Sequence, residues 1–261
     1  MPLGNQRHKW SVHQQARKRE KEMVTIEEFL ECYARLEKTV ALAFPRDKNK
    51  QHIVKCLMDN HVVGIGWPRL QKLRTIRNVF SHNPRKEGED IYAFNNSALT
   101  FLNKAIGIVQ TLPRVGNVCK SLKRVYSCRL DTIISDVVAE MMKRVYSHVP
   151  VLDDLGKVIG VFSESTMLQM HRNGWIHKNI AQMKSIRDLL PIERHKADEF
   201  PFVATSEPVP YLRRLTDDAL VDGKRIGMFL VTENGCAEEP LIGILTVWDL
   251  VGVSDGNVGN K

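Results

Sequence analysis

Three residues in the N-terminal half have side chains that together can cleave RNA. They are Arg77, Asn78 and His82, in the string LRTIRNVFSHNP that ends at Pro84. An imidazole with an ordinary pKa of about 6.5 can move a proton at neutral pH, and a guanidinium can hold a phosphate oxygen as negative charge develops. With a ribose 2′-hydroxyl as nucleophile this chemistry needs no metal, and the sequence offers no convincing metal site.

The spacing of these residues leaves a second interpretation open. Arg77 and His82 are five positions apart, about 140° around an ideal helix, so they converge only at a frayed helix end or across two copies of the chain. A helix end is expected before Pro84, because proline disfavours helical backbone in the preceding residue. Alternatively, both residues only solvate the helix surface and its C-terminus, where the helix dipole favours basic groups.

A second chemistry belongs to the C-terminal half, where a strand is expected to lead directly into a helix. The string GILTVWD places Thr246 and Asp249 at this turn, and the string GVFSEST places Ser163 at a similar turn. Free backbone N–H groups at such a turn suit a phosphate, and a carboxylate one helical turn later can accept from ribose hydroxyls. The alternative is that Thr246 and Asp249 form a capping box that binds no ligand.

These turns belong to a pattern that occurs twice after residue 116, with a period of about 80 residues. Each copy is expected to contain a strand, a helix, a β-hairpin and a closing helix. The hairpins are HVPVLDDLGKVIGVFSEST in the first copy and GMFLVTENG with PLIGILTVWD in the second.

Both copies resemble the CBS domain, named for cystathionine β-synthase, which occurs in tandem pairs that bind adenosine-type ligands. The resemblance covers residues 117–172 as unit 1 and residues 183–253 as unit 2. It implies that Ser163, Thr246 and Asp249 contact phosphate and ribose, and that Ile226 and Gly227 line the base.

The first unit departs from that pattern, which favours the second unit as the binding site. Thr166 stands where the resemblance expects the ribose-binding aspartate, and His148 stands where a small residue is usual. Glu207, which precedes Pro208, would disfavour a second or third phosphate if it faced the site. We therefore expect AMP or an adenosine-type ligand as a regulator, and no required cofactor.

The N-terminal half has helical periodicity over residues 25–45, 47–60, 68–83 and 97–112, with a capping box from Thr25 to Glu28. A four-helix bundle with R-N-x-x-x-H near the end of its third helix is similar to the HEPN family (higher eukaryotes and prokaryotes nucleotide-binding). Many members are metal-independent ribonucleases that act as dimers. For residues 23–113 the resemblance implies a homodimer with Arg77, Asn78 and His82 as catalytic residues.

Charge is divided unevenly along the chain, which favours a polyanion as partner of the N-terminal half. Residues 1–116 hold 20 Lys and Arg against 11 Asp and Glu, whereas residues 117–261 hold 18 against 19. The excess includes a basic tail at residues 1–22, and RNA is the expected partner. No apolar run is long enough to span a membrane, the start does not read as a signal peptide, and the scattered cysteines suit a reducing cytoplasm.

The sequence thus predicts an α+β protein: an all-α bundle followed by a tandem pair of βαββα units. We expect an adenine-nucleotide sensor that regulates a dimeric ribonuclease. The alternatives are a non-enzymatic sensor whose basic bundle binds nucleic acid or protein, and a purely structural dimeriser.

Overall fold

The computed structural model describes residues 23–82, 94–172, 185–189 and 200–251, which fall into two compact units divided between residues 111 and 112. The first unit is mainly helical and the second alternates strands and helices. This arrangement confirms the predicted α+β class, and the predicted basic tail lies outside the described residues.

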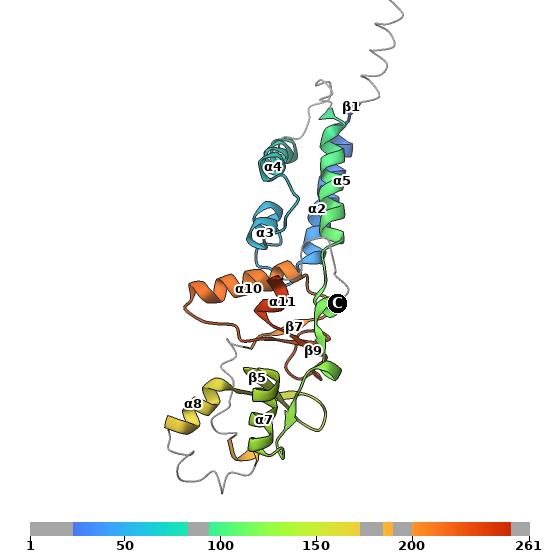
Figure 1. The fold of residues 1–261 in the computed structure, drawn as a ribbon. Coiled ribbons are helices and arrows are strands. Elements are labelled where there is room, and N and C mark those ends of the chain that lie inside the picture. The colour runs from blue at the N-terminus through green and yellow to red at the C-terminus, as the bar shows by residue number, and fades with distance from the viewer. Residues whose placement is uncertain (1–22, 83–93, 173–184, 190–199, 252–261) are drawn as a thin grey trace, which may run out of the picture. The chain divides into compact units, whose positions relative to one another are not determined.

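Four helices make up most of the described part of the first unit (Figure 1). They are α2 (Ile26–Ala43), α3 (Ile53–Asp59), α4 (Trp67–His82) and α5 (Ser97–Gln110), with a short antiparallel pair of β1 (Met23–Val24) and β2 (Phe94–Asn95). The predicted capping box opens α2: Thr25 N–H donates to Glu28 Oε2 at 2.9 Å, and Glu28 N–H donates to Thr25 Oγ1 at 3.2 Å.

Helices α2 and α5 lie side by side and supply much of the core of this unit (Figure 1). Their inward residues repeat every three or four positions, as an amphipathic helix requires. The buried faces comprise Phe29, Tyr33, Leu36 and Val40 of α2 and Leu102, Ala105, Ile106 and Val109 of α5.

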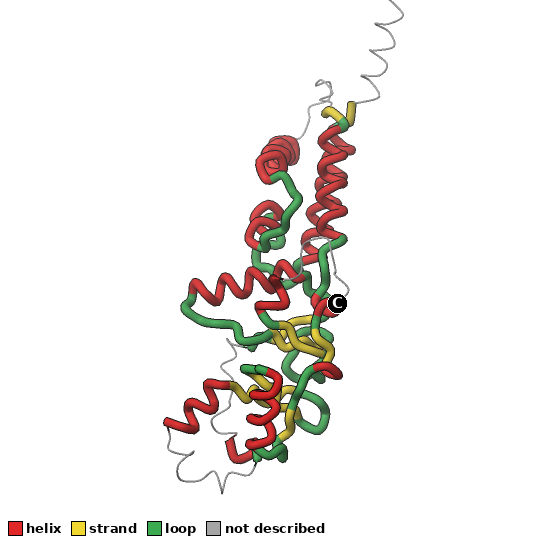
Figure 2. Tube along the Cα trace, in the orientation of Figure 1, coloured by secondary structure: helices red, strands yellow, loops and turns green. Residues whose placement is uncertain are grey.

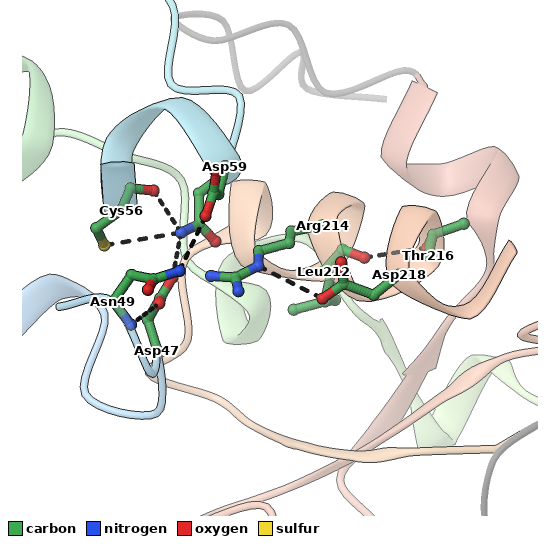
Figure 3. Close-up of polar contacts among 9 residues, drawn as sticks. Asp47, Asn49, Cys56, Asp59, Leu212, Arg214, Thr216 and Asp218 are labelled. Carbon is green, nitrogen blue, oxygen red and sulfur yellow. Dashed lines mark hydrogen bonds and ion pairs between the residues drawn. The ribbon is translucent and has the colours of Figure 1, made fainter. Parts of the chain in front are cut away.

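The second helix is shorter than the predicted span of residues 47–60, because α3 begins only at Ile53. The buried Asp47 carboxylate accepts hydrogen bonds from the Asn49 backbone N–H at 2.6 Å and from the Asn60 side chain (Figure 3). An aspartate that bonds to the backbone two residues later favours a turn over a helix. Residues 47–52 accordingly form successive turns.

The second unit contains two copies of one topology. In the first repeat, β4 (Cys128–Arg129) pairs in parallel with β5 (His148–Leu152), which forms an antiparallel hairpin with β6 (Val158–Ser163). In the second repeat, β7 (Phe202–Ala204) pairs in parallel with β8 (Phe229–Thr232), which forms a hairpin with β9 (Gly243–Leu245). The helices are α7 (Ile134–Arg144) and α8 (Glu164–Arg172) in the first repeat, and α10 (Val209–Val221) and α11 (Val247–Val251) in the second.

Strand residues alternate between two kinds of core in this unit, as the pleat of a strand requires. One set packs under the helices of its own repeat, and the other joins the two sheets face to face. Strands therefore lie between helical layers (Figure 2). The helix-facing set includes Val151, Phe162, Val231 and Leu245, and the sheet-facing set includes Leu152, Val161, Leu230 and Ile244.

Each repeat completes its core with a segment that precedes the other repeat. Helix α6 (Val115–Val118) and β3 (Lys120–Ser121) precede the first repeat, yet β3 pairs antiparallel with β9 and Val115 is buried in the second core. The 3₁₀ turn η2 (Ile186–Leu189) precedes the second repeat, yet Ile186 and Leu189 are buried in the first core. The two repeats are therefore interlocked.

Candidate functional site

The predicted base-lining and phosphate-contacting residues of the second repeat lie at the same end of one hairpin. Phe229 of β8 faces Leu245 of β9 in the antiparallel register. Gly227 and Thr246 extend these two strands beyond that pair, so both lie past the same hairpin end. The hairpin thus brings together two segments that are separated by 18 residues in sequence.

Asp249 is the centre of the polar contacts at this end. Its Oδ2 accepts from the Thr246 backbone N–H at 2.8 Å and from the Thr246 hydroxyl at 2.7 Å. Its Oδ1 lies 2.8 Å from the Lys120 ammonium, which β3 contributes from outside the repeat. The side chains of Asp249 and Lys120 are 20% and 53% exposed, so both are accessible to a ligand in solution.

These contacts favour the ionised form of Asp249. Burial alone would raise the pKa of this carboxyl group, but hydrogen bonds from Lys120 and Thr246 outweigh burial and lower the pKa below its ordinary value. The carboxylate is therefore charged at neutral pH and able to accept hydrogen bonds from hydroxyl groups.

Gly227 occupies a place where two rings approach the backbone. A Cβ at this position would lie 2.8 Å from the Phe200 ring and 2.9 Å from His148 Nε2. The His148 and Phe200 rings themselves meet edge to face, with centroids 5.4 Å apart. The sequence interpretation assigned the space beside Gly227 to a ligand ring, but two rings of the protein take up this space in the structure. Ile226, the other predicted base-lining residue, is partly buried against the core of the second repeat.

The corresponding turn of the first repeat is closed by its own hydroxyl groups. Ser163 and Thr166 are both buried, at 4% and 2% exposure, and their side-chain oxygens lie 3.1 Å apart. Ser163 Oγ also lies 2.6 Å from Ser165 Oγ, and Thr166 Oγ1 accepts from the Ser163 backbone N–H. The two turns share a position in the topology but differ at its last residue, because the first repeat has Thr166 where the second has the Asp249 carboxylate.

Glu207, which the sequence interpretation placed near the nucleotide if it faced the site, is buried at 1% exposure where α10 begins. It follows the C-terminal end of β7, whereas Gly227 precedes the parallel strand β8, so the two residues lie at opposite ends of the sheet. Its backbone carbonyl accepts from the Val115 N–H at 2.9 Å. Burial lowers the pKa of Arg114, and the Glu207 carboxylate acts in the opposite direction, so the two side chains lie near each other with opposite charges.

In the helical unit, the structure brings Arg77 and Asn78 together on α4. Arg77 Nη1 donates to Asn78 Oδ1 at 3.2 Å, while Nη2 lies 2.8 Å from a carboxylate oxygen of Glu37 on α2. The guanidinium also lies over the Tyr33 ring, 5.8 Å from its centroid. His82 ends α4, and its side chain lies outside the described residues.

Tyr33 adds a buried hydroxyl to this cluster. Its ring is 1% exposed, and its hydroxyl has no hydrogen-bond partner within the described part of the chain. Burial, and secondly the Glu37 carboxylate, raise the pKa of Tyr33 to about 12. The phenol is therefore a neutral donor beside Arg77 at physiological pH.

Three residues of these sites were missed by the sequence interpretation: Lys120, Phe200 and Glu37. Lys120 lies 129 positions before its partner Asp249, and Glu37 lies 40 positions before Arg77, so neither pairing leaves a local pattern. Glu37 follows Tyr33 by four residues, so the two side chains share one face of the helix; this spacing was the only feature of the sequence that pointed to Glu37.

Among the described residues, no group of three or more His, Cys, Asp or Glu side chains is arranged to hold a metal ion. None of the described helices is both long and apolar enough to cross a membrane.

Comparison with protein families supports the first repeat directly. Residues 115–171 match the family model of the CBS domain. The chain therefore contains a CBS-type α/β region after its helical region, and the topology of the second repeat duplicates that of the first. No curated protein matches this chain.

Several solved structures resemble about half of the chain. CBSX2 in complex with AMP is 21% identical, with 53% of this chain and 92% of CBSX2 covered and a TM-score of 0.40. A putative acetoin utilization protein (AcuB) from Vibrio cholerae is 18% identical, covering 54% and 88%, with a TM-score of 0.41. The CBS domain pair of MJ0100, in complex with 5′-methylthioadenosine and S-adenosyl-L-methionine, is 16% identical, covering 54% and 94%, with a TM-score of 0.38.

Proposed function

We propose that this protein is a regulatory sensor that binds an adenine nucleotide of the AMP or adenosine type in its second CBS-like repeat. The observation that carries the proposal is the charged Asp249, held by Thr246 and Lys120 beside the hairpin end that also holds Gly227. A carboxylate can accept from both hydroxyls of a ribose, and a neighbouring ammonium can bind a phosphate. The match of residues 115–171 to the CBS domain supports this ligand class.

The first repeat is proposed to contribute structure more than binding. Its turn offers the buried Ser163 and Thr166 hydroxyls, which already contact one another, and Thr166 stands where the second repeat has the Asp249 carboxylate. We therefore expect one nucleotide per chain.

Calorimetric titration of the full chain with AMP, ADP, ATP and adenosine tests this proposal. We expect AMP and adenosine to bind at least as tightly as ADP and ATP, because Lys120 is the cation that contacts Asp249 and its ammonium group can bind one phosphate. If none of the four ligands binds, the proposed function is wrong.

We further propose that the helical unit acts on RNA as a metal-independent ribonuclease that works as a homodimer and is controlled by the nucleotide. The hydrogen bond between Arg77 and Asn78 favours this candidate, since it aligns two of the three predicted catalytic residues. Arg77 has five N–H donors, and its contacts with Glu37 and Asn78 leave donors for a phosphate. In this scheme the His82 imidazole moves the proton, and a second chain brings the two active centres together.

His82→Ala separates this activity from simple binding. We expect the substitution to abolish degradation of RNA by the purified protein. The parent protein should still degrade RNA when EDTA is added, because the proposed mechanism needs no metal. If His82→Ala degrades RNA as fast as the parent protein, the catalytic proposal is wrong.

The alternative is a non-enzymatic sensor whose basic unit binds nucleic acid or a protein. Binding of RNA without cleavage, with an affinity that falls steeply as salt increases, would favour this alternative. Light scattering tests the dimer: a monomer both with and without AMP would contradict a site shared by two chains.

A further inference from the structure

Lys120 contacts Asp249 from a strand that is not part of the second repeat. It belongs to β3, which lies outside the second repeat and is joined to it by antiparallel pairing with β9. The β3 strand approaches β9 so closely that any side chain at Gly243 would overlap the Lys120 carbonyl oxygen. This close approach fixes the Lys120 backbone, while the long side chain remains free to change partner.

The hydrogen-bond capacity of Asp249 shows why the partner must change when a ribose binds. A carboxylate has about four acceptor positions, two on each oxygen. Thr246 fills both positions on Oδ2, and Lys120 takes one of the two on Oδ1. A vicinal diol brings two donors, so Oδ1 has enough positions for it only after Lys120 has left.

An ammonium displaced from Asp249 needs another anion nearby. We propose that Lys120 exchanges the Asp249 carboxylate for the phosphate of the bound nucleotide, and so determines the preference for a nucleoside monophosphate over the nucleoside. When adenosine binds, the ion pair between Lys120 and Asp249 is lost and no phosphate replaces it. For AMP, the phosphate replaces the lost ion pair with a charge-assisted hydrogen bond. This inference rests on the proposed nucleotide site.

Titration of Lys120→Met with AMP and with adenosine tests the exchange in the full chain. The methionine keeps a chain of similar length but removes the charge, so it neither competes for Asp249 nor binds phosphate. We expect AMP to bind at least tenfold more weakly than to the parent protein, and adenosine to bind as tightly or more tightly. The preference for AMP should thus collapse.

Two further variants make the result specific. Lys120→Arg keeps a cation in place and should retain most of the preference for AMP. Lys123→Met removes an exposed charge three residues later in the same segment and should leave both affinities unchanged. A thermal unfolding scan of each variant establishes that the fold is retained.

The outcomes separate the inference from the function on which it rests. If the parent protein binds neither ligand, the proposed function fails. If the parent protein binds both but Lys120→Met keeps the same ratio of AMP to adenosine affinity, the exchange is wrong and the site stands. Raised salt gives a second readout: it should weaken binding of AMP to the parent protein much more than binding of adenosine.

Discussion

Asp249 makes contacts that hold the fold together, and it is also the residue that we propose binds the ligand. Its contacts with Thr246 hold the start of α11, and its contact with Lys120 ties β3 to the same point. Because these hydrogen bonds lower the pKa of the carboxyl group, ionised Asp249 stabilises the folded state above its ordinary pKa of 3.8. That stabilisation is lost as the pH falls through the lowered pKa of the folded state.

Asp249→Asn should therefore destabilise the protein in a pH-dependent way. The substitution keeps the size of the side chain but removes the charge that pairs with Lys120. We expect a loss of about 1 kcal/mol in the free energy of unfolding at pH 7, and a smaller difference at pH 3. Urea unfolding at the two pH values measures this difference.

Asp154→Asn is the matched control for this measurement. Asp154 pairs with Arg129 at 2.7 Å, but its side chain is fully exposed, and exposed ion pairs add little stability. An equal loss in both variants, or an Asp249→Asn effect that does not depend on pH, would contradict the role assigned to this carboxylate.

Individual helices and strands were predicted well where the sequence pattern that defines them lies within a few consecutive residues. The capping box predicted the start of α2, and the turn in DDLGK predicted the hairpin of β5 and β6. The helix predicted over residues 47–60 begins only at Ile53, because the Asp47 carboxylate accepts a hydrogen bond from the Asn49 backbone N–H and favours a turn. Strand β3 was not predicted, because two residues carry no periodicity and its pairing with β9 depends on contacts about 120 positions away.

Substitution of Gly243 tests the pairing of β3 with β9. Ala at this position would force β3 away from β9, so we expect Gly243→Ala to lower the free energy of unfolding by roughly 1–3 kcal/mol and to weaken AMP binding. Thermal unfolding and calorimetry measure the two effects.

Gly107→Ala is the control: the same glycine-to-alanine change should stabilise the protein at this position. Gly107 lies within α5, and a Cβ there meets no atom within 4 Å. Alanine should stabilise this helix by about 0.5–1 kcal/mol relative to glycine. Destabilisation by Gly107→Ala, or none by Gly243→Ala, would contradict the packing described for these elements.

At the level of the whole molecule, the two repeats of the CBS-type region share segments, so neither hydrophobic core is complete within one repeat. Ile186 and Leu189 are buried in the first core although they precede the second repeat, and Val115 is buried in the second core although it precedes the first. Each such side chain contributes about 2 kcal/mol when it is fully buried. The same sharing of segments places Lys120, the partner of Asp249, in the stretch of chain that follows the helical unit.

Fragments of the chain test this interlocking. We expect residues 112–261 to unfold in one cooperative transition, and residues 123–182, which lack η2, to remain largely unfolded. Circular dichroism during thermal unfolding distinguishes the two. A stably folded 123–182 fragment would show that the first repeat is independent of the segment around Ile186.

Calorimetric titration of AMP into the parent protein, Asp249→Ala and Thr166→Ala tests directly whether the second repeat binds the nucleotide. The parent protein should bind one nucleotide per chain, Asp249→Ala should bind it at least tenfold more weakly, and Thr166→Ala should bind it nearly as well as the parent. Equal effects of the two substitutions, or two nucleotides per chain, would contradict the assignment of binding to the second repeat.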